Sequence, residues 1–233
     1  MKLVWSPDTA LKAYIDTVKS CEKFKETGVA ELLSAMAAGW NTKLIVESWS
    51  YGGPVAASIG LAVAARNTGG RHVCIVPDER SRAQYTKALA EAGVAAEPEV
   101  VSGEAEAAVA RLTGLDFLVV DCRRREFARV LRVAKVSPRG GVLACKNAWP
   151  RNSCCGGFRW NVVLQRGVRV VRSVFLPVGK GLDIAYIGSG SIRSSNTSAT
   201  LAPPPPPTIS SKAPSRWIKH VDQQSGEEHL FRE

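Results

Sequence analysis

The stretch from residue 116 to residue 146 reads DFLVVDCRRREFARVLRVAKVSPRGGVLACK and decides the fold. It opens on an apolar strand, Asp116–Asp121, and closes on a second one, Val142–Lys146. Strands without polar alternation, separated by an amphipathic helix, are typical of a parallel sheet that is covered on both faces. The helix is predicted because apolar residues recur at helical spacing between the two strands: Phe127, Val130, Leu131 and Ala134.

The same alternation extends along the chain in both directions. Upstream, apolar strands are predicted at 43–47 and 72–77, with a weaker one at 99–101, and each is followed by a helical pattern. Downstream, strands at 168–176 and 182–187 follow one another without a helix, so we expect an antiparallel pair at one edge. The pattern predicts an α/β fold with a mostly parallel sheet.

The composition changes after Gly188, where Ser, Thr and Asn become frequent and the run Pro203–Pro207 follows. We therefore divide the chain into a folded domain at 1–188, a Ser/Pro-rich linker at 189–215 and a C-terminal tail at 216–233. The tail has two short apolar segments around a Gly-containing connection, which predicts a hairpin.

The overall composition is that of a globular protein. Hydrophobic residues make up 45% of the 233 residues and charged residues 22%, which excludes global disorder. The longest apolar run, 55–65, has about half the length needed to cross a bilayer, and the N-terminus lacks a secretory pattern. We expect an intracellular protein, in the cytoplasm or the nucleus, without a membrane partner.

The excess of positive charge is concentrated in one region. The chain has a net charge of +10, and residues 121–180 hold 14 Lys and Arg against two acids. This concentration indicates an anionic ligand or partner, or else a solvated basic face. Trp149, Phe158 and Trp160 lie among these basic residues, an arrangement that nucleic-acid-binding proteins use and that core packing also explains.

The six cysteines do not predict a metal centre, because no two of them have C-x-x-C spacing and only three histidines are present. Cys74, Cys122 and Cys145 lie in or beside apolar strands, where cysteine acts as a small hydrophobic residue. The vicinal pair Cys154–Cys155 lacks a suitable set of companions for zinc. We expect no metal and a reducing compartment.

In an open parallel sheet, ligands bind beyond the carboxyl ends of the strands. Glu47 ends the first predicted strand, and Gly52 and Gly53 follow it, where glycines allow a ligand to approach the backbone. Asp78 and Glu79 end the second strand, a position from which carboxylates hold ribose hydroxyls. The spacing suits a nucleoside-containing cofactor, whereas the fingerprints of dinucleotide enzymes, P-loop NTPases and serine hydrolases are absent from the sequence.

Four segments in order resemble a known superfamily: Leu44–Glu47 through Gly52–Gly53, Val119–Asp121, Gly140–Leu143 with Asn147, and Leu176–Leu182. Over residues 1–188 the chain is similar to class I S-adenosylmethionine-dependent methyltransferases, with the caffeoyl-CoA O-methyltransferases as the nearest enzyme pattern. The whole chain most resembles a plant family of methyltransferase-like proteins catalogued as a domain of unknown function. The resemblance implies a seven-stranded Rossmann-like fold and S-adenosylmethionine as cofactor.

Two departures from the enzyme pattern bear on activity. Asp121 and Asn147 match two ligands of the divalent cation in the resembled enzymes, but Lys146 stands where they have a second aspartate. An ammonium there repels a cation, so the resemblance implies that the cation site is not retained. Trp49 replaces a glycine near the cofactor, which raises the question whether an adenosine fits.

Three hypotheses follow. The first is a methyltransferase-like protein that binds S-adenosylmethionine and a small or anionic substrate, with Asp121, Lys146 and Asn147 at the reaction centre and Asp121 as the candidate base. Asp121 alternatively caps the next helix. Arg123, Arg124 and Arg125 either gather an anion at the cleft, or reach solvent or pair with acids elsewhere. The second is a non-catalytic protein that binds nucleic acid or another polyanion through 121–180. The third is a protein-interaction scaffold that uses the proline-rich tail.

Overall fold

The computed structural model describes residues 4–24, 28–94, 98–149 and 159–190, together with the backbone of two strands at 217–221 and 228–232. The chain divides into two compact units, Met1–Ser194 and Ser195–Glu233. Several predicted features lie outside the described residues: Cys154–Cys155, Phe158, Pro203–Pro207 and all of the linker beyond residue 190.

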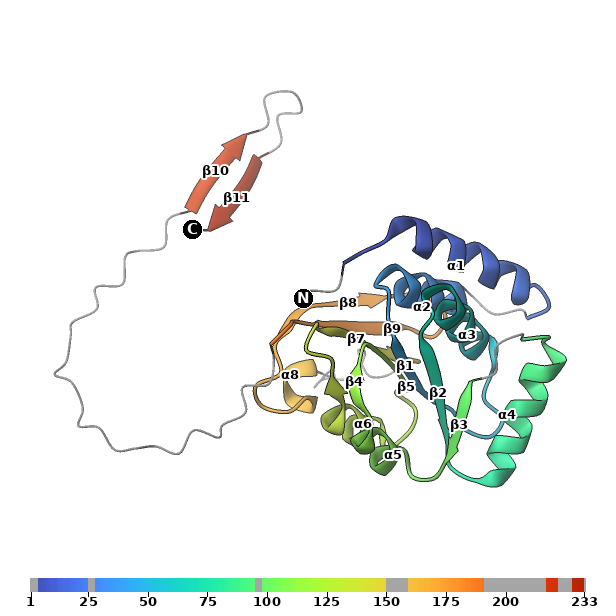
Figure 1. Ribbon diagram of the computed structural model, residues 1–233. Coiled ribbons are helices and arrows are strands. Elements are labelled where there is room, and N and C mark those ends of the chain that lie inside the picture. The colour runs from blue at the N-terminus through green and yellow to red at the C-terminus, as the bar shows by residue number, and fades with distance from the viewer. Residues whose placement is uncertain are drawn as a thin grey trace, which may run out of the picture. The chain divides into compact units, whose positions relative to one another are not determined.

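A seven-stranded sheet forms the centre of the first unit, with the order β3-β2-β1-β5-β7-β9-β8 (Figure 1). The first five strands in this order are parallel, whereas β9 runs antiparallel to both β7 and β8. The predicted α/β fold and its antiparallel edge pair are therefore confirmed. The strands are β1 (Leu44–Ser48), β2 (Arg71–Val76), β3 (Glu99–Ser102), β5 (Phe117–Asp121), β7 (Gly141–Lys146), β8 (Val170–Leu176) and β9 (Leu182–Ile187).

Helices cover both faces of the sheet (Figure 1). On β1, Ile45 faces the cluster that α1–α3 complete, and Val46 faces the cluster that α5, α6 and α8 complete. Because both faces are buried, the central strands carry apolar side chains at successive positions. The helices are α1 (Pro7–Ser20), α2 (Val29–Gly39), α3 (Ala56–Thr68), α4 (Glu79–Glu91), α5 (Ala105–Arg111), α6 (Phe127–Val133) and α8 (Trp160–Val163).

Three short elements were not predicted from the sequence. Strands β4 (Thr113–Leu115) and β6 (Lys135–Val136) form a separate parallel pair, and α8 has only four residues. Segments of this length are too short for a hydrophobic period to be recognised in the sequence. In the second unit, β10 (Trp217–Val221) and β11 (Glu228–Arg232) form an antiparallel pair. None of the described helices is long and apolar enough to span a membrane.

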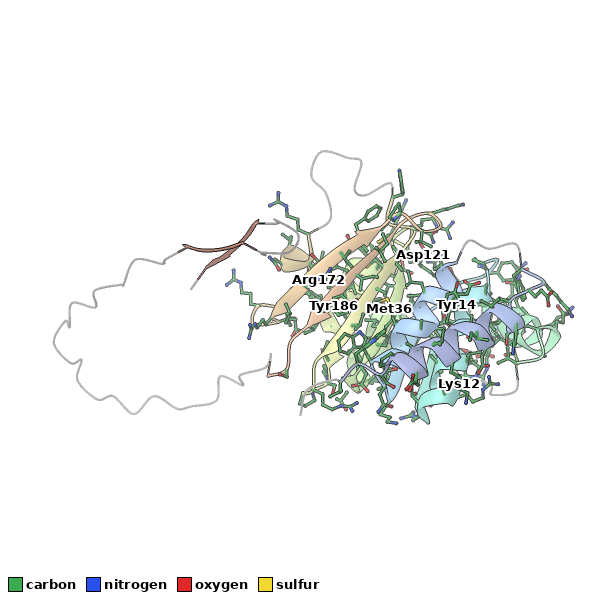
Figure 2. The ribbon with its side chains drawn as sticks, turned by 90° about the horizontal axis from the view of Figure 1, so that it is seen from above. Lys12, Tyr14, Met36, Asp121, Arg172 and Tyr186 are labelled. Carbon is green, nitrogen blue, oxygen red and sulfur yellow. The ribbon has the colours of Figure 1, made fainter. Side chains whose placement is uncertain are left out.

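Helix α1 packs on the domain through its small residues. Ala10, Ala13 and Thr17 are buried, whereas the large apolar residues of the helix are 43–60% exposed: Leu11, Tyr14, Ile15 and Val18. In the view from above, α1 lies along the outside of the helical layer, and Asp121 lies at the far end of the strands (Figure 2). Small side chains on the inner face let α1 approach α2 closely.

Asp116 joins the starts of three strands. Its carboxylate, only 1% exposed, accepts hydrogen bonds at Oδ2 from the backbone N–H groups of Lys43 (2.7 Å) and Leu44 (3.3 Å). Arg139 donates to the same oxygen at 2.7 Å from the turn before β7. The side chain thus aligns β1, β5 and β7, whose opposite ends form the site described below.

The contact between α2 and α3 depends on Gly60. A Cβ atom on this residue would overlap the carbonyl oxygen of Ala30 in α2. In an exposed helix interior, replacing Gly by Ala stabilises by about 1 kcal/mol. Here we expect Gly60→Ala to destabilise the protein by about 1–3 kcal/mol, because the two backbones must separate.

Urea denaturation followed by circular dichroism measures this change in the free energy of unfolding. Helix propensity alone predicts that Gly60→Ala stabilises the protein, whereas the packing predicts that it destabilises it. The sign of the measured change therefore distinguishes the two effects. A Gly60→Ala protein more stable than the wild type would contradict the close packing.

Candidate functional site

Two neighbouring cavities lie beyond the carboxyl ends of the central strands. Both are lined by residues 48–50, at the end of β1 and in the turn after it, and by Arg124, which follows β5. The strand order reverses between β1 and β5, which is where open α/β sheets bind their ligands. The first cavity has a volume of about 310 Å³ and the second about 390 Å³, within the range of about 300–1,000 Å³ that is usual for ligand pockets.

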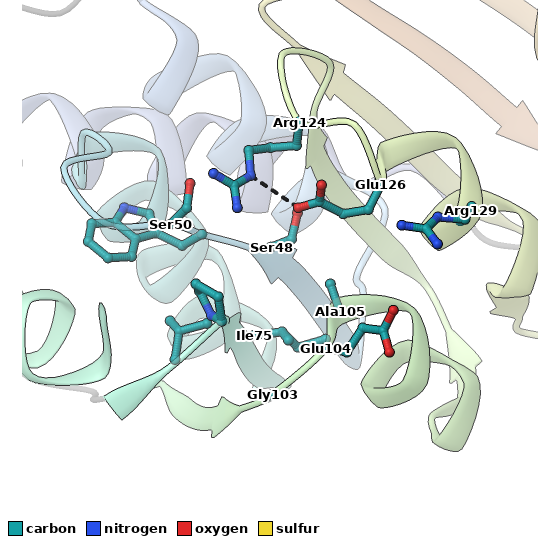
Figure 3. Close-up of a pocket in the computed structure, with 12 residues that line it drawn as sticks. Ser48, Ser50, Ile75, Gly103, Glu104, Ala105, Arg124, Glu126 and Arg129 are labelled. Atoms are coloured by element: carbon teal, nitrogen blue, oxygen red, sulfur yellow. Dashed lines mark hydrogen bonds and ion pairs between the residues drawn. The ribbon is translucent and has the colours of Figure 1, made fainter. Parts of the chain in front are cut away.

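The first cavity has an apolar side and a charged rim, in which Arg124 and Arg129 stand beside two glutamates (Figure 3). Residues 75–77 at the end of β2 and Ala105 at the start of α5 supply apolar wall. Glu104 and Glu126 bring carboxylates to it, and Arg124 donates to Glu126 Oε1 at 3.1 Å across the opening. Glu104 and Glu126 were missed in the sequence, although the end of the weak strand at 99–101 pointed to the region of Glu104.

The second cavity is lined by the turn after β1 and by the ends of β5 and β7. Its wall includes Gly52 and Gly53, together with Asp121, Arg123 and Lys146. Gly52 has φ +72°, and a Cβ there would meet no atom within 4 Å, so the turn is open on that side. The structure therefore brings the predicted glycines and the predicted strand-end residues to one cavity.

Glu47, in contrast, lies below the cavities in the core. Its side chain is fully buried, Oε1 accepts a hydrogen bond from the Tyr85 hydroxyl at 2.8 Å, and His72 Nε2 lies 3.2 Å from the same oxygen. Burial on its own would raise the pKa of Glu47, but His72 and, at longer range, Lys146 outweigh it and lower the pKa to about 2. The predicted role in cofactor binding is replaced by an anchoring role between β1, β2 and α4.

Asp78 and Glu79 also have other partners. Asp78 caps α4, because its Oδ1 accepts the backbone N–H of Ser81 at 2.7 Å. This hydrogen bond is the main cause that lowers the pKa of Asp78. Glu79 is exposed and pairs with Arg82 at 3.6 Å. Neither residue is among those that line the two cavities.

Asp121 is held by two neighbours. Oδ1 accepts the Arg123 backbone N–H at 2.9 Å, while Oδ2 accepts Arg123 Nη2 at 2.9 Å and Asn147 Nδ2 at 2.8 Å. Burial alone would raise the pKa of Asp121, but these hydrogen bonds outweigh it and the pKa is lowered. A carboxylate with a lowered pKa is a weak base, so the geometry favours an orienting role over proton abstraction.

Lys146 lies opposite Asp121 in the register of β5 and β7 and is only 8% exposed. Arg123 and Arg124 border the same cavity, whereas Arg125 is exposed and lies outside both cavity walls. Of the predicted basic cluster, the structure thus brings two arginines and Lys146 together. No group of three His, Cys, Asp or Glu side chains suited to a metal is found among the described residues.

Trp49 leaves space beside it. The ring packs edge-on against Tyr85 with centroids 5.2 Å apart, Nε1 donates to the Pro54 carbonyl at 3.1 Å, and the residue is 4% exposed. The Trp49 ring therefore packs into the core, and the same residue lines both cavities.

A minority of the basic side chains in the region 121–180 pairs with acids among the described residues. Four of its arginines pair with acids at 2.7–3.5 Å. The arginine–acid pairs are Arg123–Asp121, Arg124–Glu126, Arg129–Glu106 and Arg139–Asp116. These pairs reduce the charge available to a polyanion, although residues 150–158 of the same region lie outside the described part.

Known structures share this architecture. A methyltransferase from Geobacter sulfurreducens is 22% identical with a TM-score of 0.56, and the match covers 80% of this chain and 93% of that chain. A Staphylococcus aureus protein assigned as a caffeoyl-CoA O-methyltransferase is 16% identical, with a TM-score of 0.53 and coverage of 75% and 92%. The O-methyltransferase TomG from Streptomyces achromogenes, in complex with S-adenosylmethionine, is 21% identical, with a TM-score of 0.53 and coverage of 76% and 90%.

The chain has the Rossmann-like methyltransferase fold. This fold is defined by the strand order, in which β9 lies reversed between β7 and β8, and by the cleft at the strand ends. At this level of identity the comparison establishes the fold. The chain belongs to the DUF1442 family, described as a protein of unknown function, which it matches over residues 1–233. No curated protein matches the sequence.

The buried Glu47 carboxylate makes stability depend on acid pH. Its pKa is about 2 in the folded protein against 4.5 for an ordinary glutamate. Because the folded-state pKa is lower, this stabilisation is present above pH 4.5 and is lost as the pH falls to 2. The shift corresponds to about 3 kcal/mol. We expect Glu47→Gln to remove this component, so that its free energy of unfolding falls less steeply between pH 5 and pH 2.

Urea denaturation of both proteins at four pH values in this interval measures the difference. Glu79→Gln is the matched control, because it neutralises an exposed carboxylate after the neighbouring strand β2. Its stability should follow the wild-type curve. Parallel curves for the wild type and Glu47→Gln would contradict the assignment.

Proposed function

We propose that this protein binds S-adenosylmethionine in the two strand-end cavities and transfers its methyl group to a small molecule. The observation that carries the proposal is a pair of neighbouring cavities at the point of strand-order reversal, one with an apolar wall and carboxylates and the other with a glycine turn. The fold adds support, because TomG has the same fold and binds S-adenosylmethionine.

The first cavity suits the adenosine. Residues 75–77 and Ala105 offer an apolar surface to a base, and Glu104 or Glu126 offers a carboxylate to sugar hydroxyls or an exocyclic amine. These residues take the part that the sequence suggested for Glu47, Asp78 and Glu79. In the second cavity, Gly52 leaves open space in which the amino-acid end of the cofactor can approach the backbone, whereas the absence of a Cβ on Gly53 makes room for the carbonyl oxygen of Ser50.

When bound, S-adenosylmethionine supplies an electrophilic methyl group on a sulfonium. The residues of the chain then have to align an acceptor with it, which is the main requirement of such a transfer. Asp121 and Asn147 connect the ends of β5 and β7 and hold Arg123 in place. Since the pKa of Asp121 is lowered, it orients its neighbours rather than accepting a proton.

Titration calorimetry with S-adenosylmethionine and S-adenosylhomocysteine tests the proposal. We expect micromolar binding by the wild type. Ala105→Phe fills the first cavity and should weaken binding at least about tenfold, or 1.4 kcal/mol. Ala107→Phe adds the same ring to an exposed position of α5 and should leave binding within about twofold of the wild type.

Thermal denaturation of the three proteins shows whether each is folded. Absence of binding by the folded wild type would refute the proposed function. Equal weakening by both substitutions would show that the first cavity does not hold the cofactor.

A further inference from the structure

Lys146 is the last residue of β7 and lies in the wall of the 390 Å³ cavity. The residue is 8% exposed, so most of its side chain has lost contact with water. Among the described residues, no carboxylate lies within the 4.0 Å of an ion pair with Lys146, in contrast to four arginines of the same region. A largely buried ammonium without a direct partner is costly.

The carboxylates nearest to Lys146 are already used. Glu47 is occupied by Tyr85 and lies close to His72, and Asp121 is occupied by Arg123 and Asn147. Both act on Lys146 through space, without a direct ion pair. Within the described part of the chain, no ion pair or hydrogen bond joins either carboxylate to Lys146, so its N–H donors are available to a ligand.

The wall of this cavity is positively charged overall. Lys146, Arg123 and Arg124 face a single wall carboxylate, Asp121. The remaining wall offers small polar groups, the hydroxyls of Ser48 and Ser50 and the glycine turn at 52–53. A cavity of one charge sign with partly excluded water attracts a small ion of the opposite sign.

We infer that the 390 Å³ cavity is an oxyanion-binding site in which Lys146 holds a carboxylate or phosphate group of the methyl acceptor. Arg124, whose Nε donates to Glu126, contributes a second cation through its other nitrogens, and the exposed side of Arg123, whose other side binds Asp121, contributes a third. Charge-assisted hydrogen bonds from ammonium and guanidinium groups to an oxyanion are about twice as strong as neutral ones. The role as methyl acceptor rests on the proposed function, whereas oxyanion binding by itself does not.

An anionic acceptor explains how a reaction proceeds at a site whose carboxylate is a weak base. The acceptor oxygen forms a bond to the methyl carbon, the carbon–sulfur bond breaks, and its electron pair stays on sulfur. A carboxylate acceptor becomes a neutral methyl ester, and a phosphate acceptor becomes a methyl phosphate ester with one negative charge fewer. In both cases the positive sulfonium becomes a neutral thioether. No proton is transferred, so no general base is required.

Titration calorimetry with two oxyanion probes, benzoate and inorganic phosphate, tests the inference in the full-length protein without cofactor. We expect at least one probe to bind, more weakly as the salt concentration rises, and neutral benzamide not to bind. The tighter of the two probes identifies the oxyanion as carboxylate or phosphate. Absence of binding by both probes would overturn the inference.

Lys146→Met keeps the length of the side chain and removes its charge. We expect it to weaken the binding of the probe at least tenfold, whereas Lys87→Met, an equivalent change at an exposed site on α4, should alter it less than twofold. Unchanged probe binding by folded Lys146→Met would overturn the assignment.

The same proteins separate this inference from the proposed function. Ala105 lines the 310 Å³ cavity and is not among the residues that line the 390 Å³ cavity, so Ala105→Phe should bind S-adenosylhomocysteine at least tenfold more weakly and still bind the probe as the wild type does. Lys146-dependent probe binding by a protein that binds no S-adenosylhomocysteine would refute the proposed function and retain the oxyanion site. Binding of S-adenosylhomocysteine by a protein that binds neither probe would refute the oxyanion site and retain the proposed function.

Discussion

The fully buried carboxylate of Glu47 is the constraint around which the site is built. A charged group inside a protein is tolerated only when neighbours replace the water it has lost. Here Tyr85 donates from α4 and His72 approaches from β2, so that one side chain of β1 ties together three elements. The turn that follows β1 starts from this fixed point, and Trp49 packs against the same Tyr85. The position of the cavities relative to the sheet follows from that arrangement.

The second determinant is the register between β5 and β7. Because Asp121 and Lys146 are opposite one another, a carboxylate and an ammonium meet at the strand ends without forming a direct ion pair. Asp121 is instead satisfied by Arg123 and Asn147, and Asn147 adopts a left-handed conformation with φ +59° as the chain leaves the strand. The ammonium therefore remains available in a cavity whose wall also holds two arginines, one carboxylate, two aromatic residues and small polar groups.

The sheet could be predicted from the sequence because its strands are buried on both faces. Segments such as Phe117–Asp121 and Gly141–Lys146 leave no alternative to a central parallel strand, and the helical spacing between them fixes the crossover. Part of the site could be predicted for the same reason, since Asp121 and Lys146 end such strands and Gly52 and Gly53 follow another. Glu104 could not, because it follows a strand that is weakly marked in the sequence, and Glu126 could not, because it lies beyond the turn that follows β5.

By itself, the sequence determined the order of strands and helices, the antiparallel edge pair and the set of residues that can reach the strand ends, because these depend on local periodicity. Only the tertiary structure decided what each of those residues does. Glu47, Asp78 and Asp121 are all acids at strand ends, yet one anchors the core, one caps a helix and one orients an arginine at the cavity. The difference lies in partners that are distant in the sequence or set by side-chain direction, such as Tyr85 for Glu47 and Asn147 for Asp121. Burial and hydrogen bonding to such partners, which residue type does not reveal, separate a structural acid from a ligand-binding one.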